Sequence, residues 1–526
     1  MTSSQLLRPQ IQTSETLTPL SQSVNGIAGQ ATAAFANTFN YGPTIPTFVN
    51  SWQTFVQLYG NFNVSNGNPL HFAVYSYFAN GGTGCWVLRV ANTDAVAASV
   101  VTNDIEGGGG QPLATWTAAN KGVWGNNIYV GMTAVSTGHV NVIIYNGGTA
   151  QVNIVEQWLN VSANPNDPRY APNIINSPAG AGSNYVNVTL AYHGGAYLAG
   201  STDFGPIASP AQLASGTDGS SAPSLGLTVT QQFDQYVQQQ ILNINLPGQQ
   251  LAADINTVVN WAAGREDVFV LADGPTPSFP ETSTVVVNNY VNLVSGGASI
   301  SPSSFVAVYA PYLLIQDPSS TSLGATRYVG PCASILGTMC QTDALVGVQQ
   351  STAGTSYGKI ACVGLEAQFM PSDLDTLAVN NVNAIKNVPG NGFCVFGART
   401  LQFGFPSMYV AVRRVLMKVE HDAVLLVQPF LFSPNGPPLW AAISTVLNNY
   451  FNVQTLAGLF STNNVSQAYV VTCDQTNNTA STAQSGIVNI TIAVALGSPA
   501  EYILINIQQV NGATTVTSRA ATGPIQ

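Results

Sequence analysis

The side chains that most often carry out catalysis are few and widely spaced in this sequence. The four histidines are His71, His139, His193 and His421, and they show neither an H-E-x-x-H motif nor a paired spacing suited to zinc. The sequence also lacks the G-x-x-x-x-G-K-[ST] and G-x-S-x-G motifs. A dispersed Ser/His/Asp triad has no motif to support it. The sequence therefore predicts no catalytic residues, no metal and no cofactor.

Positive charge is concentrated in one stretch of the chain. Five of the 13 basic residues lie between positions 386 and 418, and no acidic residue lies between Asp375 and Glu420. These five are Lys386, Arg399, Arg413, Arg414 and Lys418. Arg414 and Lys418 are one turn apart on a predicted helix, and Arg413 is expected near them on its polar face. The pattern fits either a solvated helix face or a docking surface for an acidic partner.

The rest of the 526-residue chain is almost uncharged. Charged residues make up 7% of the sequence, whereas soluble proteins have about 25%. The net charge of −10 argues against nucleic-acid binding, and a hydrophobic content of 45% argues against disorder. No apolar stretch approaches the ~20 residues of a membrane span, and the N-terminus does not resemble a secretory signal. Six cysteines without a C-x-x-C pair predict reduced, mostly buried thiols.

Predicted helices and strands alternate along much of the chain, which indicates an α/β (mixed α+β) multidomain fold with partly parallel strands. The basic residues fall on a helix predicted over 406–428, which has one apolar face and is expected to be the longest. Short β-like runs between about 114 and 192 predict a small all-β insert. The other predicted elements are helices over 52–59, from 69, over 252–263, 374–384 and 439–458, and strands over 85–90, 268–272, 303–311, 393–396, 469–474 and 487–495.

An ordered set of motifs resembles the contractile phage tail sheath family. The segments GFCVFGARTL (392–401) and YVAVRR (409–414) carry the best match, and SGTDG (215–219) and GVWGNNIYV (122–130) fit the same family. The N-terminal match is PTIPTFVNSWQTFVQLYG (43–60) followed by LHFAVYSYFANGGTGCWVLRV (70–90). The chain departs from the family in its N-terminal arm motif and at 347–354, where a different segment replaces the family's "GvwkAPAG". The resemblance covers nearly the whole chain.

The resemblance implies six segments. They are an extended N-terminal arm (1–24), the N-terminal part of the inner α/β region (25–106), an inserted β-rich domain (107–208), a middle α/β domain with a subtilisin-like core (209–398), a C-terminal sheath domain (399–505) and a C-terminal arm (506–526).

The resemblance also implies a structural role without catalysis. Sheath proteins of this family form stacked hexameric rings around a tail tube, and their contraction drives the tube through the host envelope for genome ejection. The implied partners are other copies of the chain, the tube protein, and the baseplate and terminator proteins, with no direct nucleic-acid contact and no membrane insertion. The implied location is the virion tail, assembled in the host cytoplasm. The arms are expected to add strands to sheets of neighbouring subunits.

Two roles are open for the basic residues. Arg413, Arg414 and Lys418 are candidates for facing the tube. Alternatively, Arg399 and Arg413 form buried pairs with Glu501 or Glu420 that hold the C-terminal domain together. The residues expected to form a structural motif there are Gly397, Arg399, Thr400 and Glu501.

Three other functions compete with a phage sheath. The same sheath could serve a phage-derived injection system or an R-type bacteriocin. A hydrolase on the subtilisin-like core would need a positioned Ser/His/Asp set. A non-contractile shell or surface-layer protein would lack the helix that carries Arg413 and Arg414.

Overall fold

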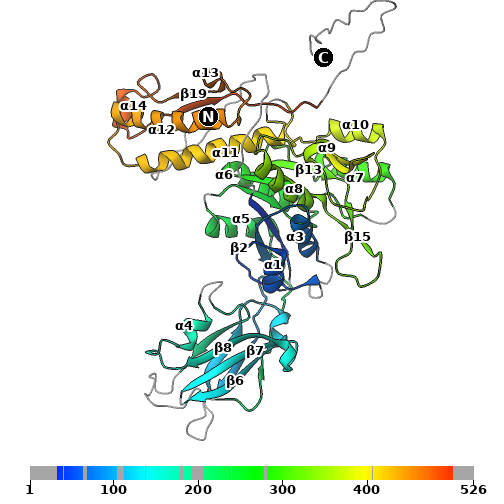
Figure 1. The fold of residues 1–526 in the computed structure, drawn as a ribbon, viewed down its shortest axis with the longest axis vertical. Helices are drawn as coiled ribbons and strands as arrows, with labels where there is room; N and C mark the ends of the chain where they lie inside the picture. The colour runs from blue at the N-terminus through cyan, green and yellow to red at the C-terminus, as the bar shows by residue number, and fades with distance from the viewer. Residues whose placement is uncertain are drawn as a thin grey trace, which may run out of the picture.

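The computed structural model of the chain combines a central sheet, an inserted β-rich unit and a C-terminal helical unit (Figure 1). The described residues are 32–39, 41–62, 68–103, 112–136, 138–177, 182–191, 206–238, 240–277, 281–404 and 407–501. The predicted arms, 1–24 and 506–526, lie outside these residues.

The central sheet has eight strands and is mostly parallel. Its order is β18 (Gly392–Phe396), β17 (Val382–Val388), β13 (Val306–Ala310), β12 (Val268–Ala272), β11 (Leu242–Asn245), β1 (Thr32–Thr38), β3 (Cys85–Val90) and β2 (Thr47–Val49). The inner strands β12 and β13 are the unbroken runs VFVLA and VAVYA, and all their residues are buried. Continuous apolar runs of this kind are typical of parallel strands covered on both faces.

Helices cover both faces of this sheet. The connections through α3 and α6 lead to opposite edges of the sheet, so right-handed crossovers place these helices on opposite faces. Helix α3 packs against α8, and α5 packs against α6. The helices of this region are α1 (Trp52–Tyr59), α3 (Pro69–Ala79), α5 (Leu225–Tyr236), α6 (Ala252–Arg265), α7 (Ser283–Ser295), α8 (Pro331–Leu345), α9 (Gly354–Tyr357) and α10 (Pro371–Val379), beside a small sheet of β15 (Thr326–Val329), β14 (Leu313–Gln316) and β16 (Gly364–Leu365).

The β-rich unit has its own apolar core, centred on Trp116. The two chain segments that join it to the central region run side by side, because Val96 pairs with Thr217 and Ser99 with Ala214. Its sheets are β10 (Ala211–Gln212), β6 (Ile128–Ser136), β7 (His139–Asn146) and β8 (Ile154–Ser162), and β4 (Ser99–Asn103), β5 (Pro112–Ala118) and β9 (Val186–Leu190); η1 (Val123–Asn127), η2 (Gln151–Asn153) and α4 (Ala171–Ile175) complete it.

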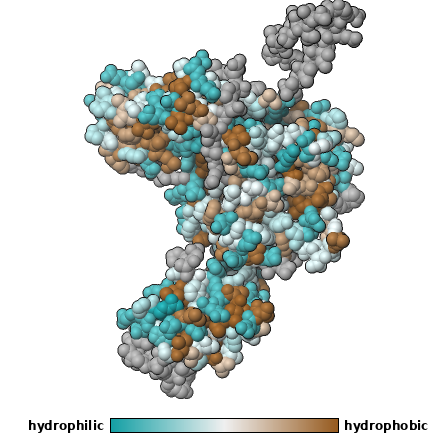
Figure 2. All heavy atoms as spheres, viewed as in Figure 1, coloured by the Kyte–Doolittle hydropathy of each residue, from teal (hydrophilic) through white to brown (hydrophobic). Residues whose placement is uncertain are grey.

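The C-terminal unit is built on two long helices that follow one another in the chain (Figure 1). Helix α11 is shared between two apolar cores: Val410 and Met417 belong to the core of the central sheet, and Val415 and Val419 belong to the C-terminal core. The unit comprises α11 (Val410–Val427), η4 (Gln428–Phe430), α12 (Pro437–Leu456), α13 (Val465–Ala468), β19 (Tyr469–Thr472), α14 (Ala480–Gln484) and β20 (Thr491–Val494). Figure 2 shows hydrophobic residues on the surface of this unit, and Val453 and Val470 are among its exposed apolar side chains.

The structure confirms mixed α/β architecture and most predicted elements, and it corrects two. The helix predicted over 374–384 ends at Val379, and β17 begins at Val382. Asn381 between them has a φ of 55°, a left-handed conformation that ends a helix. Among the described residues α12 is longer than α11, with 20 residues against 18. Pro406, the predicted start of the basic helix, lies outside the described residues.

Two helical glycines should respond in opposite ways to a methyl group. A Cβ at Gly337 of α8 would lie 2.4 Å from the backbone oxygen of Tyr77, whereas a Cβ at Gly264 of α6 would meet nothing within 4 Å. We expect Gly337→Ala to lower the free energy of unfolding by about 1–3 kcal/mol through overpacking. Gly264→Ala should raise it by up to about 1 kcal/mol. Chemical denaturation checks both, and equal effects of the two variants would contradict the α3–α8 packing.

Candidate functional site

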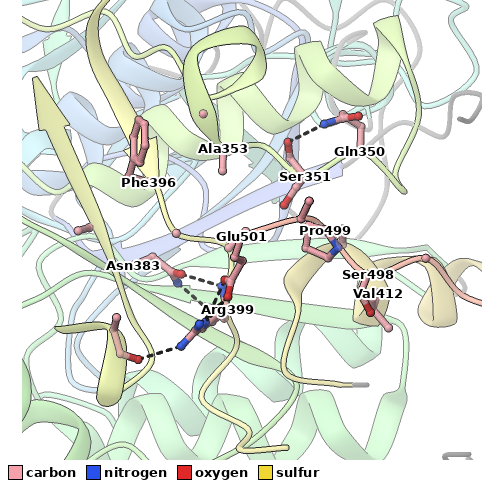
Figure 3. Close-up of a pocket in the computed structure, with 18 of the residues that line it drawn as sticks. Gln350, Ser351, Ala353, Asn383, Phe396, Arg399, Val412, Ser498, Pro499 and Glu501 are labelled. Atoms are coloured by element: carbon pink, nitrogen blue, oxygen red, sulfur yellow. Dashed lines mark hydrogen bonds and ion pairs between the residues drawn. The ribbon is translucent and has the colours of Figure 1, made fainter. Parts of the chain in front are cut away.

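The segment that carries the G-A-R-T-L motif leaves the edge of the central sheet and leads into α11. Asn383 of β17 fixes its backbone: the side-chain amide donates to the Arg399 carbonyl, and the Arg399 N–H donates back, both at 2.7 Å (Figure 3). Gly397 permits this approach, because a Cβ there would lie 2.8 Å from the Asn383 Oδ1 atom. Thr400 is buried, and its hydroxyl donates to the Ser407 carbonyl at 2.9 Å. These contacts therefore fix the backbone position of Arg399.

Arg399 and Glu501 form a two-pronged ion pair across 102 positions of sequence. The Nε and NH2 groups of Arg399 donate to the two carboxylate oxygens at 2.9 and 2.5 Å. The third guanidinium nitrogen donates to the Ala378 carbonyl at the end of α10, at 3.1 Å. Both side chains are mostly buried, with exposed fractions of 18% and 20%. The predicted pairing of Arg399 with Glu501 is present in the structure.

A cleft of about 690 Å³ lies beside this pair. Its walls include the loop containing Gln350 and Ser351, helix α10, strands β17 and β18, and the start of α11 at Val412. Residues 496–501 form the remaining wall, with Pro499 and Glu501 labelled in Figure 3. The cleft therefore lies where the central sheet meets the C-terminal unit.

Arg414 connects α11 to α8 inside the protein. Its guanidinium donates to both carboxylate oxygens of Asp343, with the NH1–Oδ1 distance at 3.1 Å. The exposed fractions of the two side chains are 6% and 0%. Two charges buried together in this way depend on each other, because either one alone would remain desolvated without compensation.

Arg413 is also buried, so the prediction of a basic polar face is wrong for this residue and for Arg414. Its NH2 group lies 2.6 Å from Glu420, two turns along the same helix, and its guanidinium carbon is 4.4 Å from the centre of the Phe305 ring. The physical reason is that α11 has apolar cores on two sides, which leaves too little solvated face for both arginines. The predicted alternative, a buried Arg413–Glu420 pair, is present.

Lys418 has a more accessible side chain and belongs to a cluster around Asp422. Its ammonium group donates to Asp422 at 2.7 Å, and the Tyr450 hydroxyl of α12 donates to the same carboxylate at 2.5 Å. Burial alone would raise the pKa of Asp422, but hydrogen bonds from His421, Lys418 and Tyr450 lower it to about 2. This cluster ties α11 to α12.

The remaining basic residue of the predicted constellation is on the central sheet and not on α11. Lys386 is on β17, and its ammonium nitrogen is 3.8 Å from the centre of the Phe396 ring on β18. The five basic residues therefore do not form one continuous surface, because each is held by a different part of the fold.

Sequence reasoning missed several residues that hold these arginines. Asp343, Asn383 and the Ala378 carbonyl are far from their partners in the chain, so no local motif links them. One available signal was Asp343 itself, an acidic residue within the mostly apolar helix α8. In a chain with so few charges, a carboxylate in such a place indicates a buried cationic partner.

The C-terminal unit also carries a small sheet with open edges. In the part of the chain that the structure describes, β19 and β20 pair only with each other, in an antiparallel register that joins Val470 to Ala493. Val470 is 56% exposed. Two-stranded sheets are marginal alone and gain stability from further strands. This pair is therefore suited to accept an added strand at either edge.

The carboxyl ends of the parallel strands, where α/β proteins commonly bind ligands, are packed with side chains. Asp273 follows β12 and is buried; it accepts hydrogen bonds from the Cys332 backbone at 3.0 Å and from Asn245 at 3.1 Å. Burial raises its pKa, and a Cβ at Gly274 would overlap the Tyr290 ring. These groups hold the start of α8 against the sheet.

The described residues contain no group of three or more His, Cys, Asp or Glu side chains arranged to hold a metal ion. Within the same residues, no helix is long and apolar enough to cross a membrane. His71 is buried against Phe39 and Phe55, and its burial lowers its pKa to about 4. His193 lies outside the described residues.

No protein-family profile matches the chain. In sequence, the chain is 24% identical over 258 residues to the tail sheath protein of Enterobacteria phage T4. This match spans 47% of the chain but only 38% of the phage protein.

Several solved structures share the fold. A sheath tail protein from Listeria innocua has a TM-score of 0.57 at 12% identity, covering 86% of this chain and 90% of that one. A chain of the anti-feeding prophage baseplate has a TM-score of 0.56 at 17% identity, with 95% and 99% covered. A chain of the sheath complex of an extracellular contractile injection system, in the contracted state, has a TM-score of 0.54 at 18% identity, with 96% and 98% covered.

The chain thus has the mixed α/β fold found in sheath proteins of contractile systems. The sequence match to the phage T4 protein adds to this likeness, and the resemblance to the contractile tail sheath family is confirmed.

Removing one charge of the buried Arg414–Asp343 pair should destabilise the protein strongly. Asp343→Asn leaves a buried guanidinium without its counterion, so we expect the free energy of unfolding to fall by about 3–5 kcal/mol in chemical denaturation. Asp234→Asn is the matched control, because Asp234 pairs with Arg265 at 3.4 Å and its side chain is 55% exposed. That change should cost at most about 1 kcal/mol. Equal losses would show that burial of the pair has no special importance.

The cluster around Asp422 predicts a defined loss of stability in acid. Because the folded pKa of about 2 lies below the unfolded value of 3.8, the ionised carboxylate stabilises the protein above pH 4. That stability is lost as the pH falls through the folded pKa. Asp422→Asn should therefore lower the free energy of unfolding by about 1–2 kcal/mol at pH 7. The difference from the unsubstituted protein should shrink by about half at pH 3; a constant difference would refute this assignment.

Proposed function

We propose that the chain is the structural subunit of a contractile sheath. It polymerises as stacked hexameric rings around a tail tube, and contraction of the rings drives the tube through the target envelope. The single observation that supports this most directly is the fold, which is shared over 95–96% of the chain with proteins of contractile injection particles. Energy for contraction is stored in subunit packing, so no nucleotide, metal or cofactor takes part.

The small sheet of β19 and β20 supports a connection between subunits by strand addition. Its two edges are free within the described residues, and Val470 is exposed beside them. The chain segments 1–24 and 506–526 are low in charge, so strands from neighbouring copies can add to these edges without repulsion. In this proposal the first and last of the six segments expected from the sequence act as arms, and the segments between them form the rings.

The tube, baseplate and terminator proteins are the further partners in this proposal, and the assembled particle is where the chain resides. A tube contact by Arg413, Arg414 and Lys418 stays a prediction. Of the three side chains, that of Lys418 is the most exposed, at 17% against 0% and 6%. Lys418 is thus the first residue to test by charge reversal in tube-binding experiments.

A sheath of a phage-derived injection system is the second candidate. The observation in its favour is that the fold is shared over 98–99% of the chains from such systems. In that case the same contraction serves a particle without a genome. The genes beside the coding sequence distinguish the two candidates, since a phage encodes a capsid and a terminase.

Deleting either arm should abolish assembly without unfolding the subunit. We expect the purified full chain to form striated tubes in negative-stain micrographs. Chains that lack 1–24 or 506–526 should remain soluble monomers, because the strand that links neighbours is missing. A Gly/Ser segment of equal length in place of 506–526 is the control for chain length. Tubes formed by an arm-deleted chain would overturn strand addition.

A further inference from the structure

Residues 496–501, here called the strap, cross from the C-terminal unit to the central sheet and end at Glu501. The beginning of the strap is well anchored. Leu496 packs against the C-terminal core. The backbone N–H of the preceding residue, Ala495, donates to the Ala468 carbonyl at 2.8 Å, and the Ala495 carbonyl accepts from the Ser461 N–H at 2.9 Å. These contacts hold the strap to its own unit.

The middle of the strap lies along a hollow. Gly497, Ser498, Pro499 and Ala500 line the cleft of about 690 Å³. Among the described residues, these four make no hydrogen bond with the rest of the chain. A segment without such contacts is positioned mainly by its two ends. The course of the strap therefore depends on the pair at its far end, Arg399 and Glu501.

That pair has the geometry of a fixed receptor for one carboxylate. Arg399 presents two parallel N–H groups to Glu501, which restricts both the position and the direction of the carboxylate. The third guanidinium nitrogen donates to the Ala378 carbonyl. The backbone N–H and carbonyl of Arg399 both bond to the side chain of Asn383, which is buried. Figure 3 shows Glu501 bonded to the guanidinium of Arg399 and Asn383 bonded to its backbone. The guanidinium of Arg399 is therefore held in its binding geometry more firmly than the cations of most surface ion pairs.

We propose that Arg399 and Glu501 form a clasp that sets the point and the direction from which the C-terminal residues leave the body of the subunit. Residues 502–526 continue directly from Glu501 and include the predicted C-terminal arm. Arg399 is a positioning residue in this proposal: it orients the arm through its bonds to Glu501. The inference rests on the proposed function, because a fixed exit matters when many identical copies have to connect in one geometry.

Glu501→Gln tests the clasp, because it keeps the shape of the side chain and removes its charge. We expect proteolytic cleavage within the strap, located by mass spectrometry, to accelerate roughly fivefold, because the charge-assisted bonds weaken and the detached strap becomes more populated. The free energy of global unfolding should fall by no more than the about 1 kcal/mol that a fivefold change represents, and tubes should be lost or become irregular. Arg399→Lys, which cannot donate two parallel bonds to one carboxylate, should have the same effect.

Asp267→Asn is the matched control. Asp267 also receives two bonds from one arginine, Arg265, at 2.7 and 2.9 Å, but this pair belongs to the central region and does not touch the strap. That variant should leave cleavage of the strap and tube formation unchanged.

The possible results separate the clasp from the proposed function. If the unsubstituted chain forms no tubes, the sheath function fails, and cleavage of the strap in the monomer still tests whether the pair holds the strap. If Glu501→Gln leaves both cleavage and tubes as they were, the clasp is refuted. Faster cleavage with normal tubes refutes its role in aiming the arm. Faster cleavage with lost tubes, absent in Asp267→Asn, supports the proposal.

Discussion

The arrangement of the C-terminal unit depends on a charge pair inside the protein. Arg414 reaches from α11 into the region of α8, and Asp343 meets it there with almost no access to water. Such a pair adds little net stability over an apolar contact, but the loss of either partner leaves an uncompensated buried charge. Helix α11 is packed into two apolar cores at once, and the pair connects it to α8 between them. Helix α12 is in turn held against α11 by the cluster around Asp422.

Local sequence signals predicted the local structure well. Some signals determine the structure of adjacent residues only, such as Ser51 before α1, Pro69 at the start of α3 and the apolar runs of β12 and β13. The structure has each of these elements where it was expected. The helix predicted over 374–384 was wrong at its second half, because Asn381 adopts a left-handed conformation. The spacing of apolar residues in the sequence does not indicate such a turn.

The candidate site was only partly predictable for a related reason. The motif residues Gly397, Arg399 and Thr400 lie within four positions of the sequence, so the sequence indicated that they act together. Which side chains they meet is decided by tertiary packing: Asn383 by the pairing of β17 with β18, and Asp343 by the approach of α8 to α11. The same packing buried Arg413 and Arg414, which a helical projection placed on the polar face. In a chain with so few charges, basic residues close in sequence had suggested a surface, and the structure uses them as internal connectors.

The side-by-side entry and exit of the β-rich unit has a consequence for how such proteins diversify. Val96 pairs with Thr217 and Ser99 with Ala214, so the two ends of more than a hundred intervening residues already lie next to each other. If the unit is removed or exchanged, the central region therefore has to close only a short gap. A unit of another length is also tolerated, because the entropic cost of closing a loop grows slowly with loop length. Among its described residues, the unit also buries its own core around Trp116, separate from the central core. Evolution can therefore replace this module as a cassette, and an engineered domain could be grafted at the same junction, while the central scaffold stays intact.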